Sequence, residues 1–133
     1  MKVKRTGFIL YVKKYQECIE FYKNILELQV VFKNESLTCF DLFGTYLMIE
    51  IEDREEFLNL ESNHKKAFGC IRINVDKVKE FSQHLKAKNI KVDYQEHSWG
   101  TIAKFLDPDG NLLAFKDEEG FAKQIETYKQ NSK

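Results

Sequence analysis

The chain has 133 residues, of which 43% are hydrophobic. This is enough apolar material for one domain, or for two small fused modules, and it argues against a disordered chain. Lysine and arginine together number 21, as do aspartate and glutamate, so the formal net charge is zero. Proteins that bind nucleic acids without sequence preference carry a basic excess that displaces counterions from phosphates, so the charge balance disfavours that function.

The sequence shows no segment suited to a membrane. The longest stretch without a charged residue runs from Leu42 to Ile49, far short of the roughly 20 apolar residues that cross a bilayer. The apolar run that ends at Val12 is too short for a secretory signal and has no small-residue cleavage site. The cysteines form no Cys-x-x-Cys pair and are widely spaced: Cys18, Cys39 and Cys70. We therefore expect a soluble, cytoplasmic protein with reduced cysteines and no membrane partner.

The same order of elements occurs twice along the chain. Gly7–Val12 is a continuous apolar run typical of a buried strand, and Gly69–Val75 is another. After the first run, apolar residues spaced by three and four predict a helix: Tyr15, Cys18, Ile19, Tyr22, Ile25 and Leu26. After the second run the corresponding stripe is Val78, Phe81 and Leu85, with Asp76 as the expected N-cap.

Three further strands are expected after each helix. They are Leu28–Phe32, Leu37–Leu42 and Thr45–Ile51 in the first half, and Ile90–Tyr94, Thr101–Leu106 and Leu112–Phe115 in the second. The last two are separated by a turn sequence, Asp107-Pro108-Asp109-Gly110-Asn111. The pattern predicts an α+β fold of tandem βαβββ modules in one domain, 1–133. The modules span about 7–51 and 69–116, with a connector at 52–68 and a C-terminal helical tail at 119–133.

Several strands carry apolar side chains on both faces, whereas strands of a sheet covered on one face alternate apolar and polar residues. One face is uniformly aliphatic or aromatic, as a face packed on a helix should be. The other mixes aromatics, small residues and isolated charges, which is typical of a ligand pocket. The alternative is that this face packs on a partner chain or on the other half of the same chain, and the two can coexist. The residues expected to line the pocket are Tyr11, Tyr46, Met48, Glu50, Arg72, Asn74 and Lys116.

Two stretches carry a resemblance to a known family. One is the first strand and helix, from Phe8 to Leu26, and the other is Trp99-Gly100 followed by Phe105 to Asn111. They resemble the vicinal oxygen chelate superfamily, which includes glyoxalase I, bleomycin-resistance proteins, fosfomycin-resistance enzymes and extradiol dioxygenases. The resemblance covers Gly7 to Phe115. It implies a half-open, barrel-like mixed sheet with a central cleft, and a homodimer.

The resemblance also implies where a metal ion would bind. In metalloenzyme members the first and fourth strands of each module supply one ligand each, usually histidine or glutamate. The matching positions here are Gly7, Glu50, Cys70 and Ala114, so only the carboxylate of Glu50 is a hard oxygen ligand. We therefore expect the family metal site to be absent and no cofactor to be bound. A divalent metal would need an unconventional set, such as zinc held by Glu50, Cys70 and His97.

Two of the expected site residues have alternative roles. A carboxylate on an apolar wall must be paired, so we predict a Glu50–Arg72 ion pair, or Arg72 with Lys116, in the space of the lost ion. The resemblance suggests that Trp99 stacks on a ligand, as an aromatic in the equivalent loop of the bleomycin-resistance group does. Packing over the hairpin or the rim of the cleft is the alternative role for this tryptophan.

The function predicted from these features is small-molecule binding of the glyoxalase/bleomycin-resistance type, without catalytic residues. One alternative is a lyase, isomerase or ring-cleaving dioxygenase of the same superfamily, similar to lactoylglutathione lyase. The other alternative is a non-catalytic dimeric interaction module. The expected lining charges, Arg72 and Lys116 against Glu50, lean basic, which favours a small anionic or neutral planar ligand over a cationic drug.

Overall fold

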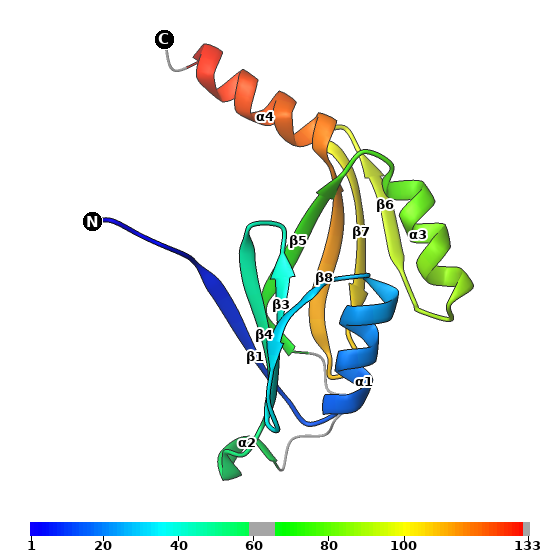
Figure 1. Ribbon diagram of the computed structural model, residues 1–133. Helices are drawn as coiled ribbons and strands as arrows, with labels where there is room; N and C mark the ends of the chain where they lie inside the picture. Colours follow the sequence, from blue (N-terminus) through cyan, green and yellow to red (C-terminus); the bar gives the residue numbers. More distant parts are fainter. Residues whose placement is uncertain (59–65, 132–133) are drawn as a thin grey trace. The chain divides into compact units, whose positions relative to one another are not determined.

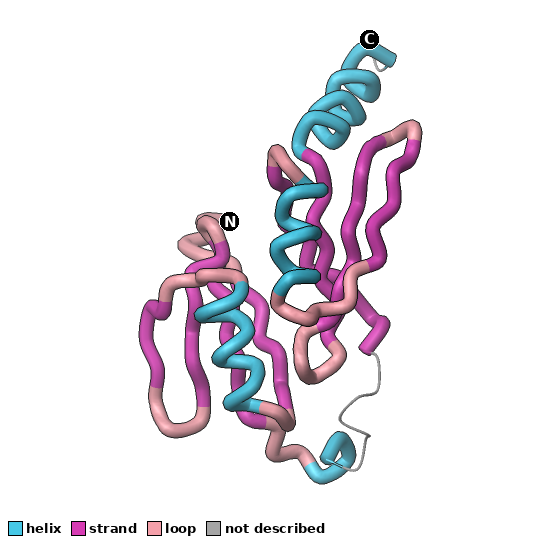
Figure 2. The backbone as a smooth tube through the Cα atoms, turned by 90° about the vertical axis from the view of Figure 1, so that its right-hand side faces the viewer, coloured by secondary structure: helices cyan, strands magenta, loops and turns pink. Residues whose placement is uncertain are grey.

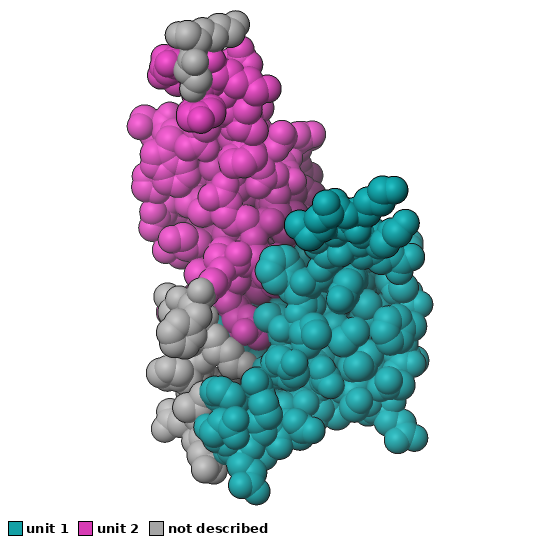
Figure 3. All heavy atoms as spheres, turned by 90° about the vertical axis from the view of Figure 1, so that its left-hand side faces the viewer, with its two compact units in different colours: residues 1–64, 107–110 teal, residues 65–106, 111–133 magenta. Residues whose placement is uncertain are grey.

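The computed structural model describes residues 1–58 and 66–131. The chain forms two compact units, one of residues 1–64 with 107–110 and the other of residues 65–106 with 111–133 (Figure 3). Residues 59–65 of the expected connector and residues 132–133 of the expected tail lie outside the described residues. No helix among those described is long and apolar enough to cross a membrane.

The first unit contains a four-stranded mixed sheet. Its elements are β1 (Gly7–Val12), α1 (Tyr15–Glu20), a π-helical turn η1 (Phe21–Ile25), β2 (Val30–Lys33), β3 (Leu37–Leu42), β4 (Thr45–Ile51) and α2 (Glu55–Leu58). The strand order is β1-β4-β3-β2. β1 runs parallel to β4, and the other neighbours are antiparallel (Figure 1).

The second unit repeats this topology. Its elements are β5 (Lys66–Val75), α3 (Val78–Ala87), β6 (Asp93–His97), β7 (Gly100–Leu106), β8 (Asn111–Asp117) and α4 (Glu118–Asn131). The order is β5-β8-β7-β6, with β5 parallel to β8. The α+β class and the tandem βαβββ organisation predicted from the sequence are therefore confirmed.

In each unit a helix packs on one face of the sheet (Figure 2). In the first unit Leu47 and Ile49 of β4 and Phe40 of β3 are fully buried on that face. The helical segment contributes Tyr22, whose ring centroid lies 6.1 Å from that of Phe40. In the second unit the rings of Phe81, Phe105 and Phe115 form the equivalent contact, at centroid distances of 5.5 and 5.1 Å. The aliphatic and aromatic faces of the strands are thus the core faces.

Two strands begin later than their apolar patterns predict. β2 begins at Val30 and not at Leu28, and β6 begins at Asp93 and not at Ile90. In both cases the first residue of the expected strand belongs to the end of the preceding helical segment. The Leu28 amide donates to the carbonyl of Tyr22, and the Ile90 amide donates to that of Leu85. Just before these two residues Glu27 and Asn89 adopt left-handed conformations, with φ of 58° and 63°. This is the usual way in which a helix satisfies its last carbonyls.

The predicted N-cap of the second helix is wrong. The cap position is Lys77, which makes no side-chain capping bond, and Asp76 precedes it. Asp76 therefore lies one residue too early to receive the amide hydrogens of the first helical turn.

The segment that leads into the first helix is held by a residue that is distant in the sequence. Its cap position, Lys14, makes no side-chain capping bond, but Oδ1 of Asp109 accepts hydrogen bonds from the amides of Lys13 and Lys14 at 3.0 and 2.9 Å. The hydroxyl of Tyr22 donates to Oδ2 of Asp107 at 2.7 Å, and the other oxygen of Asp107 accepts from the amide of Asp109. The turn at residues 107–110 therefore belongs to the first unit, and Asp107 and Asp109 are 4% and 1% exposed there.

We expect Asp109→Ala to lower the free energy of unfolding by about 1–3 kcal/mol, because it leaves two amides at the helix start without their acceptor. Urea denaturation measures this difference. Glu35→Ala, which removes an exposed carboxylate from the β2–β3 turn, is the control and should change stability by less than about 0.5 kcal/mol. Equal stability of the two variants would show that these hydrogen bonds contribute nothing.

Candidate functional site

The face of the first sheet opposite the helix carries four of the residues expected to line a pocket. The strand register places Tyr46 beside Gly7, Met48 beside Ile9, and Glu50 beside Tyr11. These residues alternate with the core residues Leu47 and Ile49, so their side chains point to the other face. Tyr11, Tyr46, Met48 and Glu50 are all half-buried. We refer to this side of the sheet as the open face.

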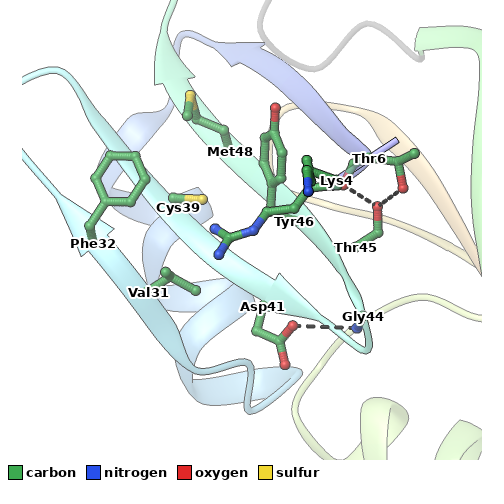
Figure 4. Close-up of a pocket in the computed structure, with 11 residues that line it drawn as sticks. Lys4, Thr6, Val31, Phe32, Cys39, Asp41, Gly44, Thr45, Tyr46 and Met48 are labelled. Carbon is green, nitrogen blue, oxygen red and sulfur yellow. Dashed lines mark hydrogen bonds between the residues drawn. The ribbon is translucent and has the colours of Figure 1, made fainter. Parts of the chain in front are cut away.

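A groove of about 560 Å³ lies on the open face (Figure 4). Tyr46 and Met48 line it, whereas Tyr11 and Glu50 do not. The other lining residues are Lys4, Arg5, Thr6, Val31, Phe32, Cys39, Asp41, Gly44 and Thr45. Figure 4 shows Phe32, Cys39, Met48 and Tyr46 spread across the strands, with Lys4 near Tyr46 and Asp41 near Gly44.

The ring of Tyr46 covers the backbone of Gly7. A Cβ atom added at position 7 would collide with three carbon atoms of this ring. Gly7 is the position at which the family resemblance places the first metal ligand, so the space that a ligand side chain would need is filled by an aromatic ring. Position 7 cannot carry a coordinating side chain unless Tyr46 moves.

The segment before β1 is tied to the edge of the groove. The hydroxyl of Thr45 donates to the carbonyl of Thr6 at 2.6 Å, and the amide of Tyr46 donates to the same carbonyl at 3.1 Å. The hydroxyls of Thr6 and Thr45 are also within hydrogen-bond distance, at 2.8 Å. These bonds extend the backbone pairing beyond the first residue of β1 and hold Lys4 and Arg5 at the groove.

Cys39 lies in the wall of the groove but is only 2% exposed. Burial raises the pKa of its thiol, so the thiol is protonated at neutral pH and is a poor nucleophile. Asp41, the carboxylate of the groove, has its Oδ1 3.4 Å from the amide of Gly44 in the β3–β4 turn. The groups that line the groove therefore offer mainly apolar contact and charge.

Tyr11 lies beneath an arginine. The guanidinium carbon of Arg54 is 4.2 Å from the centroid of the Tyr11 ring and 4.4 Å from that of Phe57. The same guanidinium donates two bonds to the carboxylate of Glu52, at 2.8 and 2.9 Å, and these hydrogen bonds raise the pKa of Arg54. Stacking and pairing of this kind position the chain after β4.

The four expected site residues of the second unit have partners within that unit. Asn74 donates to Oε1 of Glu118 at 3.0 Å, and the guanidinium carbon of Arg72 lies 5.6 Å from the ring centroid of Phe121. Both partners belong to α4. The sequence pattern placed Asn74 and Arg72 on a pocket face without showing that the C-terminal helix begins against that face.

Lys116 is fully buried, although alternation along β8 places it on the same face. Its Nζ lies 2.7 Å from Oδ1 of Asp117 and 5.2 Å from the ring centroid of Trp99. Gly100, with φ of 140°, follows Trp99, and a Cβ atom there would collide with Nζ of Lys116. Trp99 itself stacks on His97, with ring centroids 4.5 Å apart, and stays 42% exposed. The Trp99-Gly100 pair thus makes room for the buried ammonium group, and the indole stays partly exposed.

Asp117 links three parts of the second unit. It accepts hydrogen bonds from the amide of Thr101 at 2.6 Å, from Nζ of Lys116 at 2.7 Å and from the amide of Gly120 at 2.7 Å. The bond to Gly120 is a capping bond at the start of α4. These donors, Lys116 foremost, lower the pKa of Asp117 to about 2.

The described residues contain no group of three histidine, cysteine, aspartate or glutamate side chains that could hold a metal ion. Of the four family ligand positions, Gly7 is covered by a ring and Ala114 is fully buried and has no donor atom. Burial raises the pKa of the Cys70 thiol, against the opposing effect of Arg72 and Lys104. This donor set does not fit the divalent ion of the family. Glu50 and Arg72 belong to different units, and the ion pair expected between them stays a prediction.

Sequence reasoning missed Lys4, Arg5 and Phe32 as residues of the groove. Lys4 and Arg5 precede the apolar run of β1 and so fall outside every strand pattern. Phe32 faces the groove because the pairing of β2 with β3 shifts between Val30 and Phe32. A bulge of this kind reverses the alternation of side chains and is not visible in a strand of four residues.

Comparison with known proteins gives the same fold. Residues 4–115 match the family model of the Glyoxalase/Bleomycin resistance protein/Dioxygenase superfamily. Lactoylglutathione lyase from Agrobacterium tumefaciens is 18% identical, with a TM-score of 0.69 over 88% of this chain and 95% of that one. The fosfomycin resistance protein FosX from Listeria monocytogenes is 18% identical, with a TM-score of 0.72 over 90% and 98% of the two chains. TnmS3, an antibiotic binding protein from Streptomyces sp. CB03234, is 18% identical, with a TM-score of 0.69 over 88% and 98%.

The pKa of Asp117 leads to a testable pH dependence. Because its folded-state pKa lies below the ordinary value, the ionised form stabilises the folded state; this contribution is complete above about pH 4 and is lost as the pH falls towards 2. We expect Asp117→Asn to be less stable than the wild type at pH 7, with a difference that shrinks steadily as the pH falls to 2. Urea denaturation between these values measures the difference.

The control for this measurement is Asp53→Asn, which removes an exposed carboxylate of the first unit. Its stability should follow that of the wild type at every pH. A difference between Asp117→Asn and the wild type that does not change with pH would mean that the ionised carboxylate is not what holds Thr101, Lys116 and Gly120 together.

Proposed function

Because the chain belongs to the Glyoxalase/Bleomycin resistance protein/Dioxygenase superfamily, we propose that it is a small-molecule binding protein that works without a metal ion. The observation that carries this proposal is the groove of the open face, in which the Tyr46 ring fills the space above Gly7. The Tyr46 ring blocks a position at which the family places a metal ligand, and it adds an aromatic wall to the groove. The site can then make apolar contacts where it would otherwise coordinate a metal ion. That TnmS3 is described as an antibiotic binding protein is consistent with such a role.

The chemistry of the lining supports binding over catalysis. The groove offers aromatic and aliphatic walls with a few polar groups, the composition of a small-molecule site. Its thiol is protonated and its carboxylate lies in a turn. A ligand would be held there unchanged, as a sequestering or carrier protein holds it. The proposal includes a cytoplasmic location, in keeping with three free cysteines.

A second proposal concerns association of two copies. The apolar residues of α4 recur at helical spacing and are exposed: Phe121, Ile125 and Tyr128. No residue of α4 within the described part of the chain is buried, and Figure 1 shows this helix continuing beyond the end of its sheet. An exposed stripe of this kind suits a helix that packs on a second copy. On this ground we propose a homodimer. Sedimentation velocity should show a dimer for the wild type. Ile125→Glu should dissociate this dimer, whereas the control Gln124→Glu should leave it intact.

The groove can be tested by removing one wall. In a thermal-shift screen of small planar compounds, we expect at least one ligand to raise the melting temperature of the wild type, because it binds only the folded state. Phe32→Ala and Met48→Ala should weaken its binding about tenfold, the effect of losing roughly 1.4 kcal/mol of apolar contact. Calorimetric titration measures the affinities.

The matched control for this test is Phe43→Ala. Phe43 is 77% exposed at the tip of the β3–β4 hairpin and does not line the groove. Its removal deletes the same type of side chain from another exposed place in the same unit and should leave the affinity unchanged. If Phe43→Ala weakens the ligand as much as Phe32→Ala does, the ligand does not bind in the groove.

The metal-free character of the protein has a separate test. Protein purified without chelators should contain less than about 0.1 metal ion per chain by elemental analysis, since the retained carboxylate binds divalent ions weakly on its own. Glu50→Gln should leave that background unchanged. Stoichiometric metal that disappears in Glu50→Gln would overturn the proposal and restore a metal-dependent enzyme.

A further inference from the structure

Two positively charged side chains at the groove have no partner among the described residues. Within the described residues, the side chains of Lys4 and Arg5 make no hydrogen bond or ion pair, and both are exposed. The bonds between Thr6, Thr45 and Tyr46 hold the backbone just after them. The two cations are therefore kept at the groove, and no described side chain pairs with them.

The residues that line the groove have a net charge of one positive unit. Lys4 and Arg5 contribute two positive charges and Asp41 one negative charge, and the remaining lining residues are uncharged at neutral pH. Since the chain as a whole has no net charge, this excess is a property of the groove. A ligand that complements it carries one negative charge.

The rest of the lining favours an aromatic ligand. Phe32 is 50% and Val31 57% exposed, so each presents a large apolar surface that no other part of the first unit covers. Met48 adds a polarisable thioether, which makes favourable contacts with rings. Tyr46 adds a ring whose hydroxyl has no hydrogen-bond partner among the described residues and can donate to a ligand oxygen. A volume of about 560 Å³ accommodates a body of one or two fused rings.

We propose, on the basis of the function proposed above, that the ligand is an aromatic carboxylate. Its ring system lies against Phe32 and Met48, and its carboxylate pairs with the guanidinium of Arg5 and the ammonium of Lys4. A planar carboxylate matches the two parallel N–H groups of an arginine. An ion pair this exposed contributes little by itself, and it gains strength as the apolar body of the ligand excludes water from it.

The test compares two probes of the same shape. Naphthalene-2-carboxylate carries the negative charge, and naphthalene-2-carboxamide has the same ring and nearly the same outline without it. Calorimetric titration at about 50 mM salt should give a carboxylate affinity about tenfold higher than that of the amide. Arg5→Gln should reduce this preference to less than about twofold, because it weakens binding of the carboxylate more than binding of the amide.

Lys33→Gln is the matched control, because Lys33 is an exposed cation of β2 adjacent to Phe32 that does not line the groove. It should keep the full preference for the carboxylate. Raising the salt concentration to about 300 mM should lower the preference in the wild type, because exposed charges are screened.

The outcomes separate this inference from the proposed function. Equal affinities for the two probes in the wild type would overturn the inference that the ligand is an anion. If Phe32→Ala then weakens the binding of both probes, the proposal that the groove is a small-molecule site would still hold. A preference that survives Arg5→Gln and Lys4→Gln together would place the charge recognition elsewhere and overturn the inference as well. If neither probe binds but another compound from the planar screen does so in a Phe32-dependent way, aromatic carboxylates are not the ligand class.

Discussion

The arrangement of the first unit depends on the turn at residues 107–110. The cap position of α1 is a lysine with no capping side chain, and the buried carboxylate of Asp109 holds the two residues that lead into the helix through their amides. A carboxylate that is 1% exposed is tolerable only when hydrogen bonds replace its lost hydration, so helix and turn stabilise each other. Tyr22 adds a second link through Asp107, where burial and the nearby carboxylates raise the pKa of the phenol and keep it a donor. The helix is thereby fixed on the core face of the sheet, and the opposite face is left to form the groove.

Both units use a glycine to admit a large side chain from a neighbouring strand. Gly7 accepts the ring of Tyr46, and Gly100 accepts the ammonium group of Lys116. In the first unit the result is an aromatic wall in a groove, because nothing in the unit covers that ring completely. In the second unit the result is a buried ion pair with Asp117, because α4 begins where the side chain emerges. The same local exchange therefore gives a binding surface in one unit and a structural link in the other.

The parts of this structure that the sequence predicts are those set by local alternation. The bounds of β1, β3 and β4 agree with their apolar patterns, and the open-face positions of Tyr46 and Met48 follow from the same alternation. The late starts of β2 and β6 do not follow from the alternation. The amides of Leu28 and Ile90 bond to the last carbonyls of the preceding helical segments, and the residues before them are left-handed. Alternation also gives the correct face for Lys116, but its burial beside Trp99 and Gly100 is a tertiary property. Amphipathic periodicity shows that a helix exists; the surface that it contacts is a tertiary property.

The charge of the groove is likewise a local property. A chain with 21 basic and 21 acidic residues has no overall field that would attract an anion or a cation. The sequence predicts a basic site from Arg72 and Lys116, but both cations have partners within the second unit. Arg72 lies over the ring of Phe121, and Lys116 pairs with Asp117. At the groove, Lys4 and Arg5 have no partner among the residues that the structure describes. They precede the first strand, and the bonds to the carbonyl of Thr6 hold the backbone next to them. Recognition of an anion by this fold would therefore depend on a segment outside the repeated modules, and sequence changes in that segment could alter the ligand without disturbing either core.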